Sequence, residues 1–155
     1  MLSGKEIVKN MKPNLWQKLR GQPQNIVIEP FDPKCVGPNS YDIHLDNKLL
    51  VYTASILNSQ AENSTREIII PQTGFQMTPG EPYLGSTIEY TETRNFIPNI
   101  DGRSSIGRLG IEIHRTAGFG DVGFCGSWTL EITVVKPVIV YPGMRIGQLY
   151  FEVIK

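Results

Sequence analysis

Residues 102–131 read GRSSIGRLGIEIHRTAGFGDVGFCGSWTLE and hold much of the polar chemistry of this chain. A basic, hydroxyl-rich run opens the stretch, and Glu131 closes it inside an apolar, β-branched segment. Glycines recur every few residues, which is typical of turns between short strands. The stretch therefore predicts β-strands that are joined by polar loops.

The same pattern continues along the chain, where fifteen glycines and eleven prolines separate short runs rich in Val, Ile, Thr and Tyr. Many short strands with close turns are typical of an all-β sandwich or barrel. Pro79-Gly80 and Pro142-Gly143 each precede an apolar run and predict turns before strands. The runs predicted as strands are residues 26–28, 41–45, 49–52, 68–70, 83–90, 128–135, 138–140 and 148–154.

Helix signals are confined to the N-terminus. Ser3-Gly4-Lys5-Glu6 fits a capping box, and apolar residues follow it at helical spacing. We expect a short helix from about Gly4 to Lys12, with a further turn or two within Asn14–Arg20.

Length and composition favour one globular domain over residues 1–155, with 40% hydrophobic and 19% charged residues. Fifteen basic and fifteen acidic residues cancel, so the chain lacks the positive field of a DNA- or RNA-binding protein. The sequence shows neither the apolar core of a signal peptide nor a run of membrane-spanning length. We therefore expect a cytoplasmic protein that does not enter membranes.

The two cysteines, Cys35 and Cys125, are too few for a disulfide framework, and we expect both to be buried free thiols. Zinc-dependent nucleobase deaminases need an H-x-E motif and a P-C-x-x-C pair, and this sequence has neither. The two histidines, His44 and His114, lie far apart in the sequence. We therefore expect no zinc site.

Anion chemistry is concentrated in one short run. Arg103, Ser104, Ser105 and Arg108 place two guanidinium groups and two hydroxyls within six residues, with glycines on either side. Arginine suits bidentate phosphate binding. A solvated turn with surface arginines explains the same residues equally well, so both interpretations stay open.

Carboxylates at three further positions can be interpreted from their surroundings, and one of them has two interpretations. Glu131 either faces solvent from its strand or is partly shielded so that it can shuttle protons. Asp121 fits a turn in which its side chain bonds its own backbone. Asp42 and His44 alternate with apolar residues, which predicts the polar side of a strand.

Several ordered motifs resemble the dCTP deaminases of the trimeric dUTPase-like superfamily, over most of the chain. The matching segments are Ser40–Leu45, Pro79–Glu81, Leu84–Glu89, Gly102–Ser105, Arg108–Gly110, His114–Gly118, Asp121–Gly126, Thr129–Glu131 and Pro142–Leu149. The resemblance implies a distorted, jelly-roll-like β-barrel that forms a homotrimer with three active sites at subunit interfaces.

In this resemblance each active site takes residues from two subunits. One subunit would bind the triphosphate with Arg103, Ser104, Ser105 and Arg108, and Ser104 and Arg108 would also order the catalytic water and carboxylate. The neighbour would supply the rest of the pocket. There the resemblance implies pyrimidine contacts from the backbone at Arg115, Thr116 and Ala117, a deoxyribose contact from Asp121 and sugar packing by Phe124. Gln148 is also expected to contact the substrate.

The implied activity is hydrolytic deamination of dCTP to dUTP and ammonia, in pyrimidine deoxynucleotide metabolism. Glu131 would take a proton from water attacking C4, deliver it to N3 and help ammonia leave. Magnesium would be held by the triphosphate of the substrate rather than by protein ligands.

Other members of the superfamily give alternatives. Gly107, Thr116-Ala117-Gly118 and Gln148 look more like bifunctional members, which also hydrolyse dUTP to dUMP and pyrophosphate. A pure dUTPase would not need Glu131, and the retained catalytic set argues against a non-catalytic regulatory trimer. The family also offers dTTP as an inhibitor. Its members usually continue into a C-terminal tail that closes over the nucleotide, so we expect this lid to be missing or replaced after Lys155.

Overall fold

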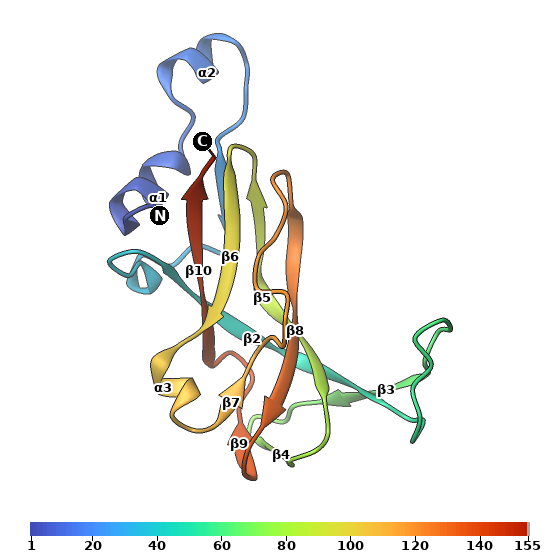
Figure 1. Cartoon of the computed structure of the whole chain (residues 1–155). Helices are drawn as coiled ribbons and strands as arrows, with labels where there is room; N and C mark the ends of the chain where they lie inside the picture. Colours follow the sequence, from blue (N-terminus) through green and yellow to red (C-terminus); the bar gives the residue numbers. More distant parts are fainter. Residues whose placement is uncertain (155) are drawn as a thin grey trace.

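Strands dominate the computed structural model, which describes residues 1–154 (Figure 1). The mainly β architecture and the short N-terminal helix confirm the expectation from the sequence. The elements are α1 (Gly4–Asn10), α2 (Leu15–Leu19), β1 (Ile26–Glu29), the 3₁₀ turn η1 (Pro33–Cys35), β2 (Tyr41–Tyr52), β3 (Thr65–Ile69), β4 (Phe75–Met77), β5 (Tyr83–Thr93), β6 (Phe96–Gly102), α3 (Ser104–Gly107), β7 (Ile111–Glu112), β8 (Cys125–Val134), β9 (Val138–Val140) and β10 (Arg145–Val153).

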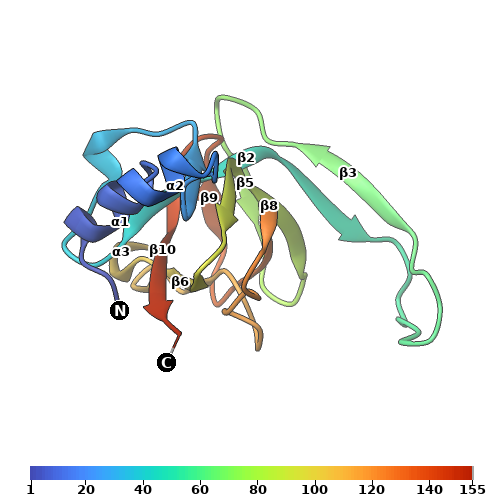
Figure 2. The same cartoon turned by 90° about the horizontal axis from the view of Figure 1, so that it is seen from above.

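Eight strands form one antiparallel sheet whose central path runs β6-β10-β2-β5-β8-β7. Strand β1 adds to β5 and β3 adds to β2, while β4 and β9 form a separate two-stranded sheet. Seen from above, the strands wrap around a common core, and the β2–β3 hairpin extends away from it as an arm (Figure 2). The wrapping brings β6, β10 and β2 side by side, and these strands carry much of the candidate site.

Strand β2 changes partners along its length. Its first half pairs with β10 and its second half with β5, which it joins at Leu45 opposite Thr87. Tyr41, Ile43 and Leu45 are fully buried, and the residues between them lie on the opposite face. The sequence predicted two strands here, but the structure keeps one strand through residues 46–48, where its pairing with β5 is irregular and Lys48 still pairs with β3.

Strands β10 and β6 approach closely where the sheet ends. A Cβ on Gly147 would lie 2.6 Å from Ile113 Cδ1 and 3.0 Å from the Asp101 carbonyl oxygen, so a side chain would force these strands apart. Gly147 pairs with Gly102, the last residue of β6. The glycine therefore lets β10 support the start of the loop that carries Arg103.

The N-terminal capping box is present. The Ser3 hydroxyl accepts a hydrogen bond from Glu6 N, and a Glu6 carboxylate oxygen accepts one from Ser3 N. Helix α1 ends at Asn10 rather than at Lys12, because Pro13 disfavours helical backbone in the residue before it. The expected further turn forms as α2, which has its own capping box at Asn14.

The elements that escaped the sequence analysis include three strands and one α-helical turn: β4, β6, β7 and α3. Strand β6 contains Pro98, which usually argues against a strand. Proline is tolerated here because β6 lies at one end of the sheet path, with β10 as its partner strand. The other three elements have four residues or fewer, too few to give a periodic signal.

The two cysteines differ in environment. Cys35 is buried as expected, but the expectation for Cys125 was wrong, because its side chain is exposed at the start of β8. Burial raises the pKa of the Cys35 thiol, and the nearby Arg145 charge opposes this only in part.

Within residues 1–154, no helix is both long enough and apolar enough to cross a membrane.

Replacing Leu130 tests the placement of the core. Leu130 is fully buried on β8, so Leu130→Ala should lower the free energy of unfolding by about 2–5 kcal/mol, through lost contacts and a cavity. Leu57→Ala, at a side chain that is 46% exposed, should change it by less than about 0.5 kcal/mol. Urea unfolding measures both. A cost below about 1 kcal/mol for Leu130→Ala would contradict the core described here.

Candidate active site

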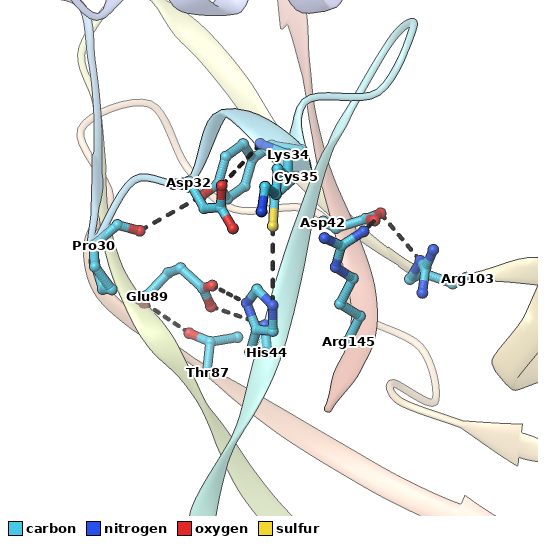
Figure 3. A network of polar contacts seen from close by, with 11 residues as sticks. Pro30, Asp32, Lys34, Cys35, Asp42, His44, Thr87, Glu89, Arg103 and Arg145 are labelled. Carbon is cyan, nitrogen blue, oxygen red and sulfur yellow. Dashed lines mark hydrogen bonds and ion pairs between the residues drawn. The ribbon is translucent and has the colours of Figure 1, made fainter. Parts of the chain in front are cut away.

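Arg103 stands at the junction between β6 and α3. Its backbone is extended, at φ −77° and ψ 143°, and its side chain forms no capping bond with the helical turn that follows. Arg103 Nε instead lies 3.1 Å from Asp42 Oδ1, and Arg145 Nη1 lies 3.3 Å from Asp42 Oδ2 (Figure 3). One carboxylate from β2 thus joins a guanidinium from the loop to another from β10.

An open cleft of about 340 Å³ lies beside this loop. Arg115 faces it from across the loop, and His114 Nε2 lies 3.5 Å from Asp101 Oδ1 at its wall. The lining residues are Asp101, Gly102, Arg103, Ser104, Gly107, Ile111, Glu112, Ile113, His114 and Arg115. We call this the arginine–serine cleft, and its guanidinium and hydroxyl groups suit an anion.

Glu131 lines a second open cleft, of about 470 Å³, with Gly80, Pro82, Glu112, Arg115, Thr133, Val134 and Val135. We call this the glutamate cleft. The Glu131 side chain is half-buried, and its Oε2 accepts a hydrogen bond from the Arg115 backbone N–H at 3.1 Å. Its backbone N–H donates to the Ile113 carbonyl at 2.9 Å. These two bonds fix the strand and one carboxylate oxygen, and the second oxygen has no hydrogen bond within residues 1–154.

The two clefts adjoin, because Glu112 and Arg115 line both. Arg115 Nη1 lies 3.8 Å from Glu112 Oε2, and both side chains are 61% exposed. Exposed ion pairs of this kind contribute little stability and rearrange easily. A ligand could therefore displace this pair and contact both clefts.

The structure brings only some of the expected site residues together. Arg103, Ser104 and Arg115 share the arginine–serine cleft, and Arg115 and Glu131 share the glutamate cleft. Gln148 lies at the base of the loop, where Ser40 Oγ donates to its side chain at 3.1 Å and its Nε2 lies 3.5 Å from the Gly102 carbonyl.

Other expected residues lie outside both clefts. Ser105 and Arg108 are exposed on and just after α3, and Thr116 and Ala117 are exposed in the loop before β8. These four line neither cleft and face away from the protein interior.

Asp121 and Phe124 precede β8, whereas Glu131 lies near the end of that strand. The Asp121 carbonyl accepts from Phe124 N at 3.0 Å, so the expected turn is present, closed by backbone rather than by the Asp121 side chain. The Phe124 ring packs on Trp128, with centroids 4.5 Å apart.

Sequence reasoning missed the partners of the polar face of β2. His44 Nδ1 lies 2.5 Å from Glu89 Oε1, and the His44 backbone N–H donates to Glu89 Oε2 at 2.9 Å (Figure 3). Glu89 is only 1% exposed, and Cys35 Sγ lies 3.9 Å from His44 Nε2. The alternation of polar and apolar residues correctly predicted that Asp42 and His44 share one face of β2. Their partners, Arg145 and Glu89, lie on other strands whose register the sequence does not reveal.

The model of the dCTP deaminase-like family matches residues 1–154. A protein of Clostridium beijerinckii named dCTP deaminase, dUMP-forming is 50% identical over 152 residues, which cover 98% of this chain and 82% of the relative. A protein of the same name from Cytophaga hutchinsonii is 53% identical over 131 residues, covering 84% and 76% of the two chains.

Two solved structures share the fold at low sequence identity. The 2′-deoxycytidine 5′-triphosphate deaminase of Agrobacterium tumefaciens has a TM-score of 0.70 and 21% identity, covering 98% of this chain and 47% of that one. A dUTPase of Staphylococcus bacteriophage 80alpha has a TM-score of 0.51 and 12% identity, covering 84% and 90%. The dUTPase-like barrel expected from the sequence is thereby confirmed. The family-model match over residues 1–154 and the relatives of 50% and 53% identity establish that the chain belongs to the dCTP deaminase-like family.

Proposed function

We propose that this protein deaminates dCTP and that the dUTP formed is hydrolysed further to dUMP and pyrophosphate. The observation that carries the proposal is the half-buried Glu131 carboxylate, whose second oxygen has no hydrogen bond within residues 1–154, on a chain that also bears the arginine–serine cleft. Relatives that are 46–53% identical are named dCTP deaminase, dUMP-forming, which supports the bifunctional alternative over release of dUTP as the final product.

The arginine–serine cleft would bind the triphosphate. Arg103 and Ser104 line it, and Ser105 and Arg108 are exposed on and just after α3, where they could contact phosphates or a neighbouring protomer. Within residues 1–154 no group of three or more acidic, histidine or cysteine side chains converges on a point. The guanidinium and hydroxyl groups of the arginine–serine cleft suit phosphates, and magnesium would arrive bound to those phosphates, which is the usual habit of that ion.

Glu131 would perform the proton chemistry. Its fixed Oε2 faces the Arg115 backbone, which leaves Oε1 to contact a water or the pyrimidine. As a base it would accept a proton from water attacking C4, and as an acid it would deliver that proton to N3. It would then carry the second proton of the water from the C4 hydroxyl to the amino group, which leaves as ammonia while the C4 carbonyl forms. A single positioned carboxylate is sufficient for these transfers.

We further propose a homotrimer in which each site combines the phosphate residues of one protomer with Glu131 of the next. The exposed positions of Arg108, Thr116 and Asp121 support this, because they line neither the arginine–serine cleft nor the glutamate cleft. Exposed apolar side chains such as Val135 and Ile139, which are 70% and 51% exposed, would be covered in such an assembly.

The neighbouring protomer would also complete the nucleoside pocket. The backbone at Arg115, Thr116 and Ala117 would contact the pyrimidine, Asp121 the 3′-hydroxyl, and Phe124 the sugar. Gln148 would support the phosphate loop.

dTTP is a candidate inhibitor because it offers the same triphosphate. The two unpaired cysteines suit a reducing compartment, so we propose a cytoplasmic location.

Product analysis tests the proposed activity. The protein is incubated with dCTP and magnesium, ammonia is quantified, and nucleotides are separated by chromatography. One ammonia per dCTP, with dUMP and pyrophosphate as final products, is the expected result. EDTA should stop the reaction, whereas a zinc-selective chelator should not. Ammonia with dUTP alone would remove the second step, and no ammonia would refute the deaminase.

Glu131→Gln tests the proton carrier. Glutamine keeps the size of the side chain and one hydrogen-bonding oxygen but cannot carry the proton, so deamination should fall roughly a hundred- to ten-thousandfold while dCTP still binds. Rapid-quench kinetics and calorimetry measure the two quantities. Glu112→Gln, on the neighbouring strand β7 and lining the same cleft, is the matched control. A loss below about tenfold for Glu131→Gln would leave it a structural role.

Mixing two inactive variants tests the shared site. Arg103→Ala and Glu131→Gln should each be inactive alone, because one lacks the phosphate fork and the other the base. Co-refolded in equal amounts as a cyclic trimer, they should regain activity at about a quarter of sites. If mixed trimers verified by mass spectrometry stayed inactive, both residues would have to come from the same chain.

A further inference from the structure

We propose that Asp42 is a positioning residue that orients the Arg103 guanidinium toward the substrate phosphates. Arg145, which contacts the same carboxylate, gives the three-residue cluster a net positive charge. The inference rests on the proposed function, since it names what orients the phosphate-binding loop. It starts from the shared carboxylate that joins β2, β10 and the loop after β6 (Figure 3).

The atoms that touch determine what Arg103 can still do. Asp42 Oδ1 contacts Arg103 through Nε, at 3.1 Å. A guanidinium held at Nε keeps its terminal amino groups available, and arginine binds phosphate best as a two-pronged fork. Arg103 also lines the arginine–serine cleft, so the anchored side chain borders the space where an anion would lie.

Arg145 changes the charge balance of the pair. A carboxylate bonded to a single arginine would cancel its charge and weaken its attraction for phosphate. Because Arg145 Nη1 lies 3.3 Å from the other oxygen of Asp42, two positive charges share one negative charge. The cluster therefore keeps a net positive charge, and Asp42 orients Arg103 without neutralising the site.

The surrounding sheet fixes Asp42 itself. Gln148 is the register partner of Asp42 on β10, and Arg145 is the partner of His44. His44 lies two residues after Asp42 on the same face of β2, and its two contacts with the buried Glu89 hold this part of the strand in place. The Asp42 side chain is only 16% exposed, so it has little freedom to turn away from its two arginines.

A purely structural role predicts a different outcome from a positioning role. If Asp42 only stabilised the sheet, its loss would affect stability and all ligands alike. If it acts through Arg103, its loss should weaken phosphate binding selectively, and only while Arg103 is present. A double-mutant cycle separates the two cases.

The cycle uses Asp42→Asn, Arg103→Gln and the double variant, with calorimetric titration of magnesium triphosphate, the inorganic anion. Each single variant should bind it at least about tenfold more weakly, since each loses one or more charge-assisted hydrogen bonds. The double variant should bind no more weakly than Arg103→Gln alone. Deoxycytidine, which lacks phosphates, should bind all four proteins equally. With dCTP, Asp42→Asn should raise KM about tenfold and change kcat by less than about threefold.

Asp46→Asn, on the same face of β2 but bonded only to the Asn47 backbone, is the control and should behave as wild type. Melting temperatures verify that each variant folds. Should Asp42→Asn not fold, Arg145→Gln carries the test, and it should weaken triphosphate binding several-fold by removing the second charge.

Additive losses of about a hundredfold in the double variant, or an effect on kcat alone, would overturn the proposal. A wild-type protein that deaminates dCTP but shows additive losses would refute only the positioning role, whereas one that binds no triphosphate would refute the proposed function as well.

Discussion

Strand β2 changes partner between His44 and Leu45, and the rest of the molecule is arranged around that change. Up to His44 it pairs with β10, and from Leu45 it pairs with β5. Where β5 no longer offers backbone partners, the Glu89 carboxylate accepts the His44 N–H and contacts the His44 ring. A buried backbone group without a partner is costly, so this side chain is part of the reason the barrel can close.

The site follows from this closure. By diverting to β10, β2 places Asp42 beside the end of β6, where Arg103 begins the loop. On its other edge β5 pairs with β8, where Glu131 borders a cleft next to the end strand β7. The anion-binding groups and the proton-carrying carboxylate thus lie toward opposite ends of the sheet path, which is why neither cleft alone contains the complete chemistry.

Local signals in the sequence were sufficient for some features. The capping box at Ser3, the strand alternation around Ile43 and the turns at Pro79-Gly80 and Pro142-Gly143 depend on neighbouring residues, and the structure contains them all. The motif resemblance identified the family. The Asp42–Arg145 bond joins residues 103 positions apart, and the Pro98 strand and the exposed Cys125 depend on sheet position. Such features require strand register, which local patterns do not encode.

Water activated at Glu131 should supply the oxygen that replaces the amino group of dCTP. A single turnover in ¹⁸O-labelled water measures this directly, if the base is freed from its sugar and phosphates before mass spectrometry. The account predicts one ¹⁸O at C4 of uracil for every ammonia released, and neither product from Glu131→Gln. Uracil without the label, or labelled uracil formed at an undiminished rate by Glu131→Gln, would contradict it.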